Sequence, residues 1–307
     1  MDNGVSNMRK LVESKVILFA SAILLLGGSA MYGQARADAY VRNCWDGFDY
    51  SLFTGLDKNL SDQSDTLSEA YRLERKLAGY FWVLRMASDS GAQVSVRNLL
   101  DSVAVYCGSG EYPTGYDKLL EAAELYFYTP GSEYFSEKVF LMFLEHKIGR
   151  IDIAEVEKSR EKYLAALIKR NMVGSMAENL ALKGGRKSSL YDVLGALTER
   201  QSLMLVFFSA ECGTCIDGIT RLKYSPVLKK QIQEGEMAVL AVCVEGKLSH
   251  VKSVLPGDWM VASDGGAVYQ DQTYSIRNTP SVYVLERSGV VLLKDADVSS
   301  AIDFLLE

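Results

Sequence analysis

Two cysteines separated by two residues, Cys212 and Cys215, form the pair in this sequence best suited to chemistry. They follow an apolar run of strand length at 203–208 and precede a segment, 216–228, whose pattern predicts a helix. A cysteine at a helix N-terminus faces unpaired backbone N–H groups and the positive end of the helix dipole, which favour a thiolate. The thiolate attacks disulfides, and a second nearby sulfur can release the mixed disulfide that results. We therefore predict a dithiol redox site in which Cys212 attacks and Cys215 resolves.

Zinc binding and a structural disulfide are the other uses of such a pair. A structural zinc site needs a second pair of ligands, but the two histidines, His146 and His250, are isolated and there is no second Cys-x-x-Cys. A structural disulfide between these cysteines would close a very short loop, which gives little stabilisation. We therefore predict no metal and no dissociable cofactor.

The sequence after the cysteines predicts further strands around them. Residues 237–244 and 281–293 carry apolar runs of strand length, and 274–280 has the pattern Tyr-x-Ile-x-x-Thr-Pro. These segments, together with a Cys-Gly-Thr-Cys directly after a strand, resemble a thioredoxin-fold oxidoreductase over residues 175–307. The resemblance implies an α/β thioredoxin fold for this part of the chain.

The resemblance also implies a substrate-binding surface. In thioredoxin-fold oxidoreductases the proline at the position of Pro280 is cis and faces the cysteines, and a cis bond is far less costly before proline than elsewhere. The backbone of the preceding residue, here Thr279, pairs with the substrate chain. Gly213 and Thr214, between the cysteines, complete the expected surface. The alternative for Pro280 is an ordinary trans proline that opens an edge strand.

The site departs from the usual thioredoxin pattern in three places. Glu211 and Thr214 stand where a tryptophan and a proline are typical, and Val206 stands where a buried acid helps to deprotonate the second cysteine. Glu211 would place a like charge beside the first thiolate and oppose its formation, or it is simply a solvated residue at the helix entrance. The base for the second cysteine would then be Asp217, a water molecule or another domain.

Segment 1–37 has the pattern of a secretory signal peptide. Arg9, Lys10 and Lys15 precede the apolar run 16–26, and Ala35-Arg-Ala37 supplies small residues for cleavage. We expect cleavage between about Gln34 and Asp38, which would place the mature chain in the periplasm or otherwise outside the cytoplasm. An uncleaved anchor helix is the alternative, although the apolar run is shorter than a membrane span requires.

Residues 38–172 are predicted to form an all-α domain, with 173–307 forming the thioredoxin-like domain. Apolar residues recur at helical spacing in five stripes: 70–84, 96–107, 119–126, 135–142 and 156–167. Segments of this half resemble a helical domain of unknown function that precedes thioredoxin-like domains in exported Gram-negative proteins: 45–49, 123–132, 143–145 and 171–174, with 258–259 in the second half. The resemblance implies this architecture and a periplasmic location, and it supplies no substrate for the helical domain.

The three remaining cysteines are predicted to have structural roles. Cys243 lies in an apolar strand and is expected to be a buried, inert thiol. Cys44 and Cys107 allow either a structural disulfide or two buried free thiols. Because disulfides persist outside the cytoplasm, an exported dithiol protein needs an unidentified redox partner, or works as an oxidant or isomerase.

These features together predict thiol–disulfide exchange with protein or peptide substrates through Cys212 and Cys215. The net charge of −6 and the absence of a basic cluster in the sequence argue against nucleic acid as a partner. One alternative is a non-catalytic thioredoxin-fold scaffold whose helical domain binds a partner or ligand. Another is a peroxidase, which needs an arginine beside an activated cysteine; Arg221 is the candidate.

Overall fold

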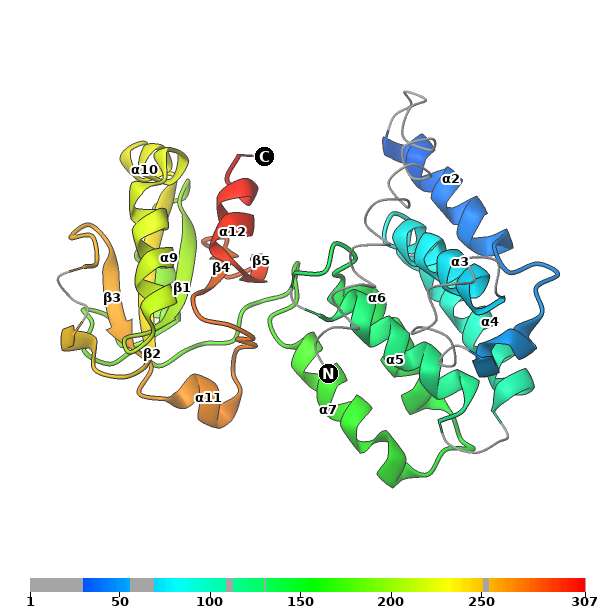
Figure 1. Cartoon of the computed structure of the whole chain (residues 1–307). Coiled ribbons are helices and arrows are strands. Elements are labelled where there is room, and N and C mark those ends of the chain that lie inside the picture. Colours follow the sequence, from blue (N-terminus) through cyan, green and yellow to red (C-terminus); the bar gives the residue numbers. More distant parts are fainter. Residues whose placement is uncertain (1–29, 56–68, 109–112, 130, 251–253, 307) are drawn as a thin grey trace. The chain divides into compact units, whose positions relative to one another are not determined.

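The computed structural model describes residues 30–55, 69–108, 113–129, 131–250 and 254–306. It divides into two compact units, Met1–Ala165 and Ala166–Glu307, here called the helical unit and the thioredoxin unit (Figure 1). Residues 1–29, which hold most of the predicted signal peptide, lie outside the described residues. Across the described ranges, no helix is both long enough and apolar enough to cross a membrane.

The described part of the helical unit is built from helices, as the sequence predicts. They are α2 (Ala30–Asn43), η1 (Tyr50–Gly55), α3 (Glu69–Leu84), α4 (Asp89–Cys107), α5 (Gly115–Phe127), α6 (Glu137–Gly149), η2 (Glu155–Lys158) and the start of α7 (Ser159–Lys169). Side-chain caps fix where several begin: Ser88 accepts a hydrogen bond at the start of α4, and Thr114 and Asp117 form a capping box on α5.

The fifth apolar stripe does not form the buried face that the sequence predicts. Val156 and Tyr163 are 78% and 48% exposed, and α7 instead buries Glu161, Ala165 and Ile168. The apolar pattern is misleading here because a charged residue, Glu161, occupies the buried face of α7. Lys147 Nζ lies 2.8 Å from a carboxylate oxygen of Glu161, which compensates this buried charge.

The thioredoxin unit contains a five-stranded mixed sheet in the order β3-β2-β1-β4-β5. The strands are β1 (Ser202–Ser209), β2 (Met237–Glu245), β3 (Met260–Ser263), β4 (Ser281–Leu285) and β5 (Val291–Ala296). The central strand β1 pairs parallel with β2 and antiparallel with β4. This is the mixed sheet of a thioredoxin fold, as the sequence predicts, and it places β1 in the middle of the sheet.

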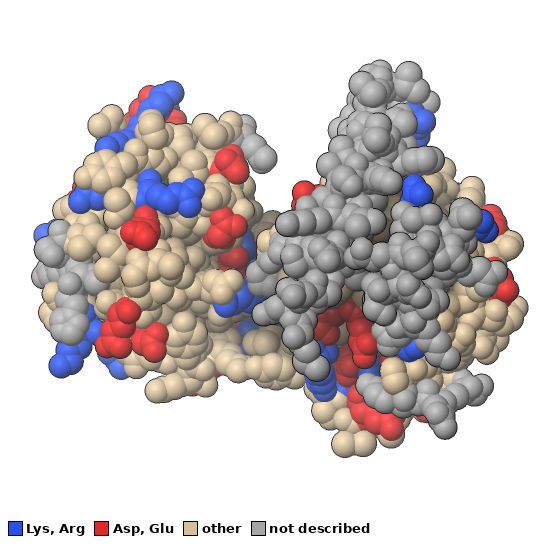
Figure 2. Space-filling view, in the orientation of Figure 1, with Lys and Arg blue, Asp and Glu red and all other residues tan. Residues whose placement is uncertain are grey.

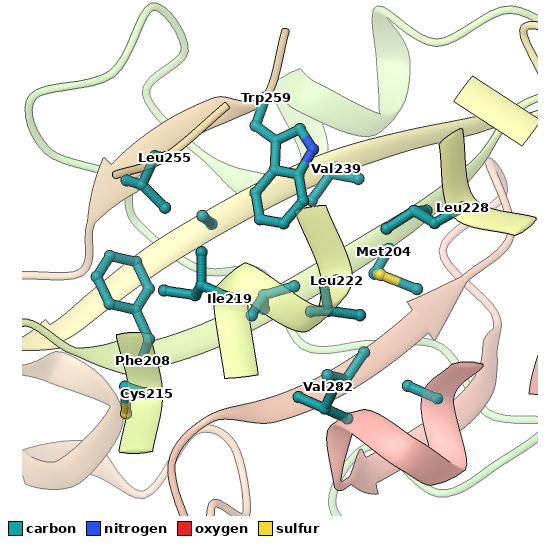
Figure 3. Close-up of a cluster of buried hydrophobic side chains, with 14 of the residues drawn as sticks. Met204, Phe208, Cys215, Ile219, Leu222, Leu228, Val239, Leu255, Trp259 and Val282 are labelled. Carbon is teal, nitrogen blue, oxygen red and sulfur yellow. The ribbon is translucent and has the colours of Figure 1, made fainter. Parts of the chain in front are cut away.

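Alternate residues of the strands supply two buried clusters, one on each face of the sheet. On β1, Met204, Val206 and Phe208 join the cluster under α9 (Gly213–Tyr224), α10 (Pro226–Gln233) and α12 (Val298–Phe304). Leu203, Leu205 and Phe207 join the other cluster, which includes α8 (Leu190–Gly195) and Val268 of α11 (Ala267–Asp271). Figure 3 shows Phe208 and Cys215 at one end of the first cluster. The two-residue period of the strand therefore decides which side chains lie beneath the cysteines.

The helix predicted after the cysteines proves to be two helices. Instead of one segment at 216–228, α9 ends at Tyr224 and α10 begins at Pro226. Ser225 between them is extended (φ −61°, ψ 119°) and caps α10. Proline suits the first position of a helix because it has no N–H to leave unpaired, and it keeps the preceding residue out of the helical region.

Candidate dithiol site

The cysteine pair lies where the central strand passes into a helix. Beyond β1, the N–H of Ala210 donates to the carbonyl of Glu245 at 2.9 Å, which continues the pairing with β2. Cys212 is the N-cap residue of α9 and has an extended backbone (φ −102°, ψ 117°). Cys212 is partly exposed, whereas Cys215, one turn into the helix, is 0% exposed. The two thiols therefore differ in their access to solvent.

Hydrogen bonding lowers the pKa of Cys212 below its ordinary value. The first cause is the Thr214 hydroxyl, whose oxygen lies 2.9 Å from Sγ of Cys212. Backbone and side-chain hydrogen bonds from Cys215 are the next causes. A thiolate accepts such donors better than a thiol does, so the accessible sulfur is also the more readily ionised one.

Burial raises the pKa of Cys215, and a hydrogen bond from the Thr279 side chain acts in the opposite direction. Val206, where thioredoxins carry an acid, is fully buried in the same apolar cluster as Cys215. Asp217 is exposed and lies two residues along α9 from Cys215. Positions two apart do not share a helix face, so Asp217 is poorly placed to take the proton of Cys215.

The Thr279–Pro280 peptide is cis, as the resemblance implies. A Cβ atom built at Gly218 of α9 would lie 2.5 Å from Cγ of Pro280, so the proline ring packs directly against the helix that carries the cysteines. The sequence reasoning missed Gly218. A glycine inside a predicted helix reduces its stability, so it signals a site where another segment approaches the backbone closely.

Glu211 and Gly213 lie on the exposed side of the site. The Glu211 side chain packs against Gly246, where an added Cβ would lie 2.9 Å from its Cγ. Burial raises the pKa of Cys243, and the Glu211 charge adds a small part of this effect, whereas the donors that lower the pKa of Cys212 are Thr214 and Cys215. The sequence left open whether the Glu211 charge acts on Cys212, and in the structure the carboxylate is directed toward Gly246 in the loop after β2.

Cys44, Cys107 and Cys243 are free thiols with separate surroundings. Cys107 donates to the carbonyl of Tyr50, and Cys44 is hydrogen-bonded to the Tyr40 side chain. The structure therefore has Cys44 and Cys107 as two free thiols, one half-buried and one buried, which was one of the expected alternatives.

Arg221, the candidate for peroxidase chemistry, donates to Ser299 Oγ at 2.9 Å. Within the described residues, no three His, Cys, Asp or Glu side chains are grouped to hold a metal.

Basic and acidic side chains are interspersed on the face of the thioredoxin unit shown in Figure 2. Both signs of charge appear there, and the described residues form no continuous basic patch on this face.

Comparison with solved structures shows a similar fold. A thioredoxin-like protein from Bacteroides caccae matches 89% of this chain and 93% of its own, at 22% identity and a TM-score of 0.72. The C-terminal domain of an uncharacterised protein from Bacteroides fragilis matches 45% of this chain and 99% of its own (26% identity, TM-score 0.40). The thioredoxin domain of a thiol-disulfide oxidoreductase from Bacteroides vulgatus matches 44% and 98% (16% identity, TM-score 0.34).

The first of these similarities extends over most of both units and confirms the predicted resemblance at the level of the fold. No family model matches the sequence, and no curated protein matches it either.

Proposed function

We propose that this protein is an exported thiol–disulfide oxidoreductase that exchanges disulfides with protein or peptide substrates through Cys212 and Cys215. One observation carries the proposal: a partly exposed thiol of lowered pKa at the N-cap of α9 and a buried thiol of raised pKa in its first turn lie at the same helix N-terminus. The Thr279–Pro280 loop packs against the same helix and would present its backbone to the substrate chain.

In the first step, the Cys212 thiolate attacks one sulfur of a substrate disulfide. A bond forms between this sulfur and Cys212, and the other substrate sulfur leaves as a thiolate that takes up a proton. In the second step, Cys215 loses its proton and attacks the sulfur of Cys212. This releases the second substrate thiol and leaves a Cys212–Cys215 disulfide, so two electrons pass to the substrate. Turnover then requires an external dithiol, and the reverse sequence would oxidise a substrate dithiol.

The second step is expected to be the slower one. Burial keeps Cys215 protonated, and the neighbouring Val206 cannot accept a proton. The Thr279 hydroxyl stabilises the Cys215 thiolate once it forms, but it is not a base at neutral pH. Water that reaches the opened site would have to take the proton.

Trapping of mixed disulfides tests the proposal. Cys215→Ser keeps the shape of the site but removes the resolving sulfur, so it should accumulate covalent complexes with periplasmic proteins on a non-reducing gel. Cys212→Ser should trap far fewer covalent complexes. Cys107→Ser, which replaces a buried thiol of the helical unit, should behave as the unmodified chain. If Cys215→Ser and Cys212→Ser trap nothing or trap equally, the oxidoreductase proposal is wrong, and a non-catalytic scaffold is favoured instead.

We further propose that export follows cleavage between about Gln34 and Asp38. Helix α2 runs through this segment, and Asp38 accepts hydrogen bonds from the N–H and hydroxyl of Ser88 at 2.7 and 2.8 Å. A chain that begins at Asp38 would keep this contact. Mass spectrometry of the exported protein should give a mature mass that starts in this range. A full-length chain in the membrane fraction would contradict cleavage.

A further inference from the structure

The loop from Arg277 to Ser281 is fixed at both ends to one carboxylate, that of Asp295 on β5. At the first end, Arg277 donates from its backbone N–H at 3.3 Å and from Nε at 2.5 Å to Oδ2. At the other end, the Ser281 hydroxyl donates to Oδ1 at 2.7 Å. Every hydrogen bond described for this carboxylate therefore comes from the two ends of a single five-residue loop.

This carboxylate is buried, and its position is energetically demanding. The side chain of Asp295 is 2% exposed and that of its ion-pair partner Arg277 is 17% exposed. Asp295 also has a φ of +46°, in the left-handed region that non-glycine residues seldom adopt. Burial raises the pKa of Asp295, and the Arg277 charge opposes this effect. A buried ion pair adds little net stability compared with apolar side chains of similar size, so stability alone does not account for it.

The loop that Asp295 holds is the one that meets the cysteines. Thr279, at its centre, hydrogen-bonds to the Cys215 side chain. Pro280 lies against Gly218 of α9, where there is no room for even a methyl group. A small displacement of the loop would therefore move both contacts with the cysteine-bearing helix.

We propose that Asp295 is a positioning residue for disulfide exchange, which holds the Arg277–Ser281 loop where the Thr279 backbone meets the substrate chain. This inference rests on the function proposed above. Asp295 acts through the loop and touches neither cysteine nor substrate. Removing its charge should loosen the loop, weaken substrate binding and leave the nucleophile unchanged, because the donors to Cys212 all belong to α9.

The test compares Asp295→Asn with Asp297→Asn in the full chain. Asp297 lies two residues further on, is exposed and caps α12 through the N–H groups of Ser299 and Ser300. An asparagine there keeps the cap and removes the same charge without touching the loop. Ser281→Ala, which deletes one anchor only, provides a milder variant if Asp295→Asn folds poorly.

The kinetic measurement is reduction of a synthetic peptide with one intramolecular disulfide, with dithiothreitol as the reductant. Asp295→Asn should lower kcat/KM about tenfold or more, mainly through KM, because misplaced binding groups weaken the productive complex. Ser281→Ala should show a smaller loss, and Asp297→Asn should stay within about twofold. The rate at which iodoacetamide alkylates Cys212 should be unchanged in all three, which shows that the thiolate is intact.

Amide hydrogen exchange provides a measurement that does not depend on activity. Asp295→Asn should speed exchange at Arg277, Asn278 and Thr279, and Asp297→Asn should not. Unchanged exchange in this loop, or a kcat/KM within twofold of the unmodified chain, would overturn the positioning role. If exchange increases as expected but the unmodified chain reduces no disulfide, the loop anchor stands and the proposed oxidoreductase function fails.

Discussion

Cys107 and Cys212 lie at opposite ends of their helices, one in each unit. Cys107 is the last residue of α4, is 4% exposed and donates its thiol hydrogen to the carbonyl of Tyr50. Cys212 precedes the first turn of α9, is partly exposed and is hydrogen-bonded to the Thr214 hydroxyl at 2.9 Å. Burial raises the pKa of Cys107, and hydrogen bonding lowers that of Cys212.

The comparison shows that burial and hydrogen-bond partners decide how readily each cysteine ionises, and the two helix ends act in the same direction. A helix C-terminus offers carbonyl oxygens and the negative end of the dipole, which favour the protonated thiol. A helix N-terminus offers N–H groups and the positive end, which favour the thiolate. The predictions below test this contrast, beginning with the largest expected effect.

Alkylation of the reduced protein at neutral pH should separate the two thiols most clearly. Iodoacetamide should modify Cys212 first and Cys107 about a hundredfold more slowly, because Cys107 is buried and holds its proton. Peptide mapping by mass spectrometry after short exposures would give the two rates, and unfolded protein, in which the two should react alike, is the control. Equal alkylation rates in the folded protein would show that the two thiols do not differ in reactivity.

The pH dependence of the resolving step should be the next largest effect. Because burial raises the pKa of Cys215, its thiolate fraction falls about tenfold for each pH unit below that pKa, and release of a preformed mixed disulfide should slow in proportion. Stopped-flow measurement of release between neutral and alkaline pH would show the slope. Release that does not depend on pH would mean that a base is already in place.

Val206→Asp should weaken this pH dependence and speed release several-fold at neutral pH, because it puts a carboxylate in the cluster that contains Cys215. Val206→Asn has the same shape without the base and is the matched control. Both should reduce the free energy of unfolding by about 2–7 kcal/mol, the cost of burying a polar group without a hydrogen-bond partner. Equal release rates in the two variants would exclude proton acceptance at this position.

Two helix glycines, one in each unit, allow the packing inside the two units to be compared. Gly79→Ala in α3 should raise the free energy of unfolding by up to about 1 kcal/mol, because the nearest atom to the new methyl, Tyr40 Oη, is 3.7 Å away. Gly218→Ala should instead lower it by about 1–3 kcal/mol, since the methyl group would collide with Pro280. Urea unfolding gives both values. A stabilised Gly218→Ala would show that the Pro280 loop moves freely away from α9.

Thr214→Val should slow alkylation of Cys212 at neutral pH by about threefold to tenfold, because it removes a hydrogen bond to the thiolate worth about 1 kcal/mol at this exposed position. Thr214→Ser retains the hydroxyl and should react within about twofold of the unmodified chain. Titration of thiolate absorbance would place the pKa of Cys212 higher in the valine variant. A rate unaffected by valine would assign the lowered pKa of Cys212 to the backbone N–H groups and the Cys215 side chain.

Glu211→Gln should have the smallest effect, under about twofold on the same alkylation rate, because the side chain packs on Gly246 and an exposed charge is screened by solvent. An increase beyond threefold would show that the carboxylate does act on Cys212. Repeating the measurement at low and high salt would distinguish a field effect from a change in local structure.

The sequence predicts the elements of the site that depend on local pattern. The strand before Cys212 and the helix after it follow from apolar runs and spacing, and the cis Pro280 follows from the family resemblance. The alternation of β1 between two clusters does not, because every residue from 203 to 208 is apolar. The break at Ser225 was visible as a serine followed by proline, but the apolar pattern on either side concealed it.

Other features depend on contacts between residues distant in sequence. The anchoring of Arg277 by Asp295 joins positions 18 residues apart, and no periodicity distinguishes a buried aspartate at a strand end from a solvated one. The buried Glu161 was missed for the same reason, because its partner Lys147 lies on another helix. Charged residues that are buried as pairs can be identified only when the fold has brought them together.

The alternation of β1 between two clusters restricts how this site can vary over evolutionary time. Deleting Ser202 or Leu203, for example, would turn Met204, Val206 and Phe208 toward the opposite cluster. It would also draw Cys212 back along the strand by about 3.3 Å, away from the Thr279–Pro280 loop. Insertions and deletions should therefore accumulate in the connections between strands, whereas β1 should change by substitution at constant length.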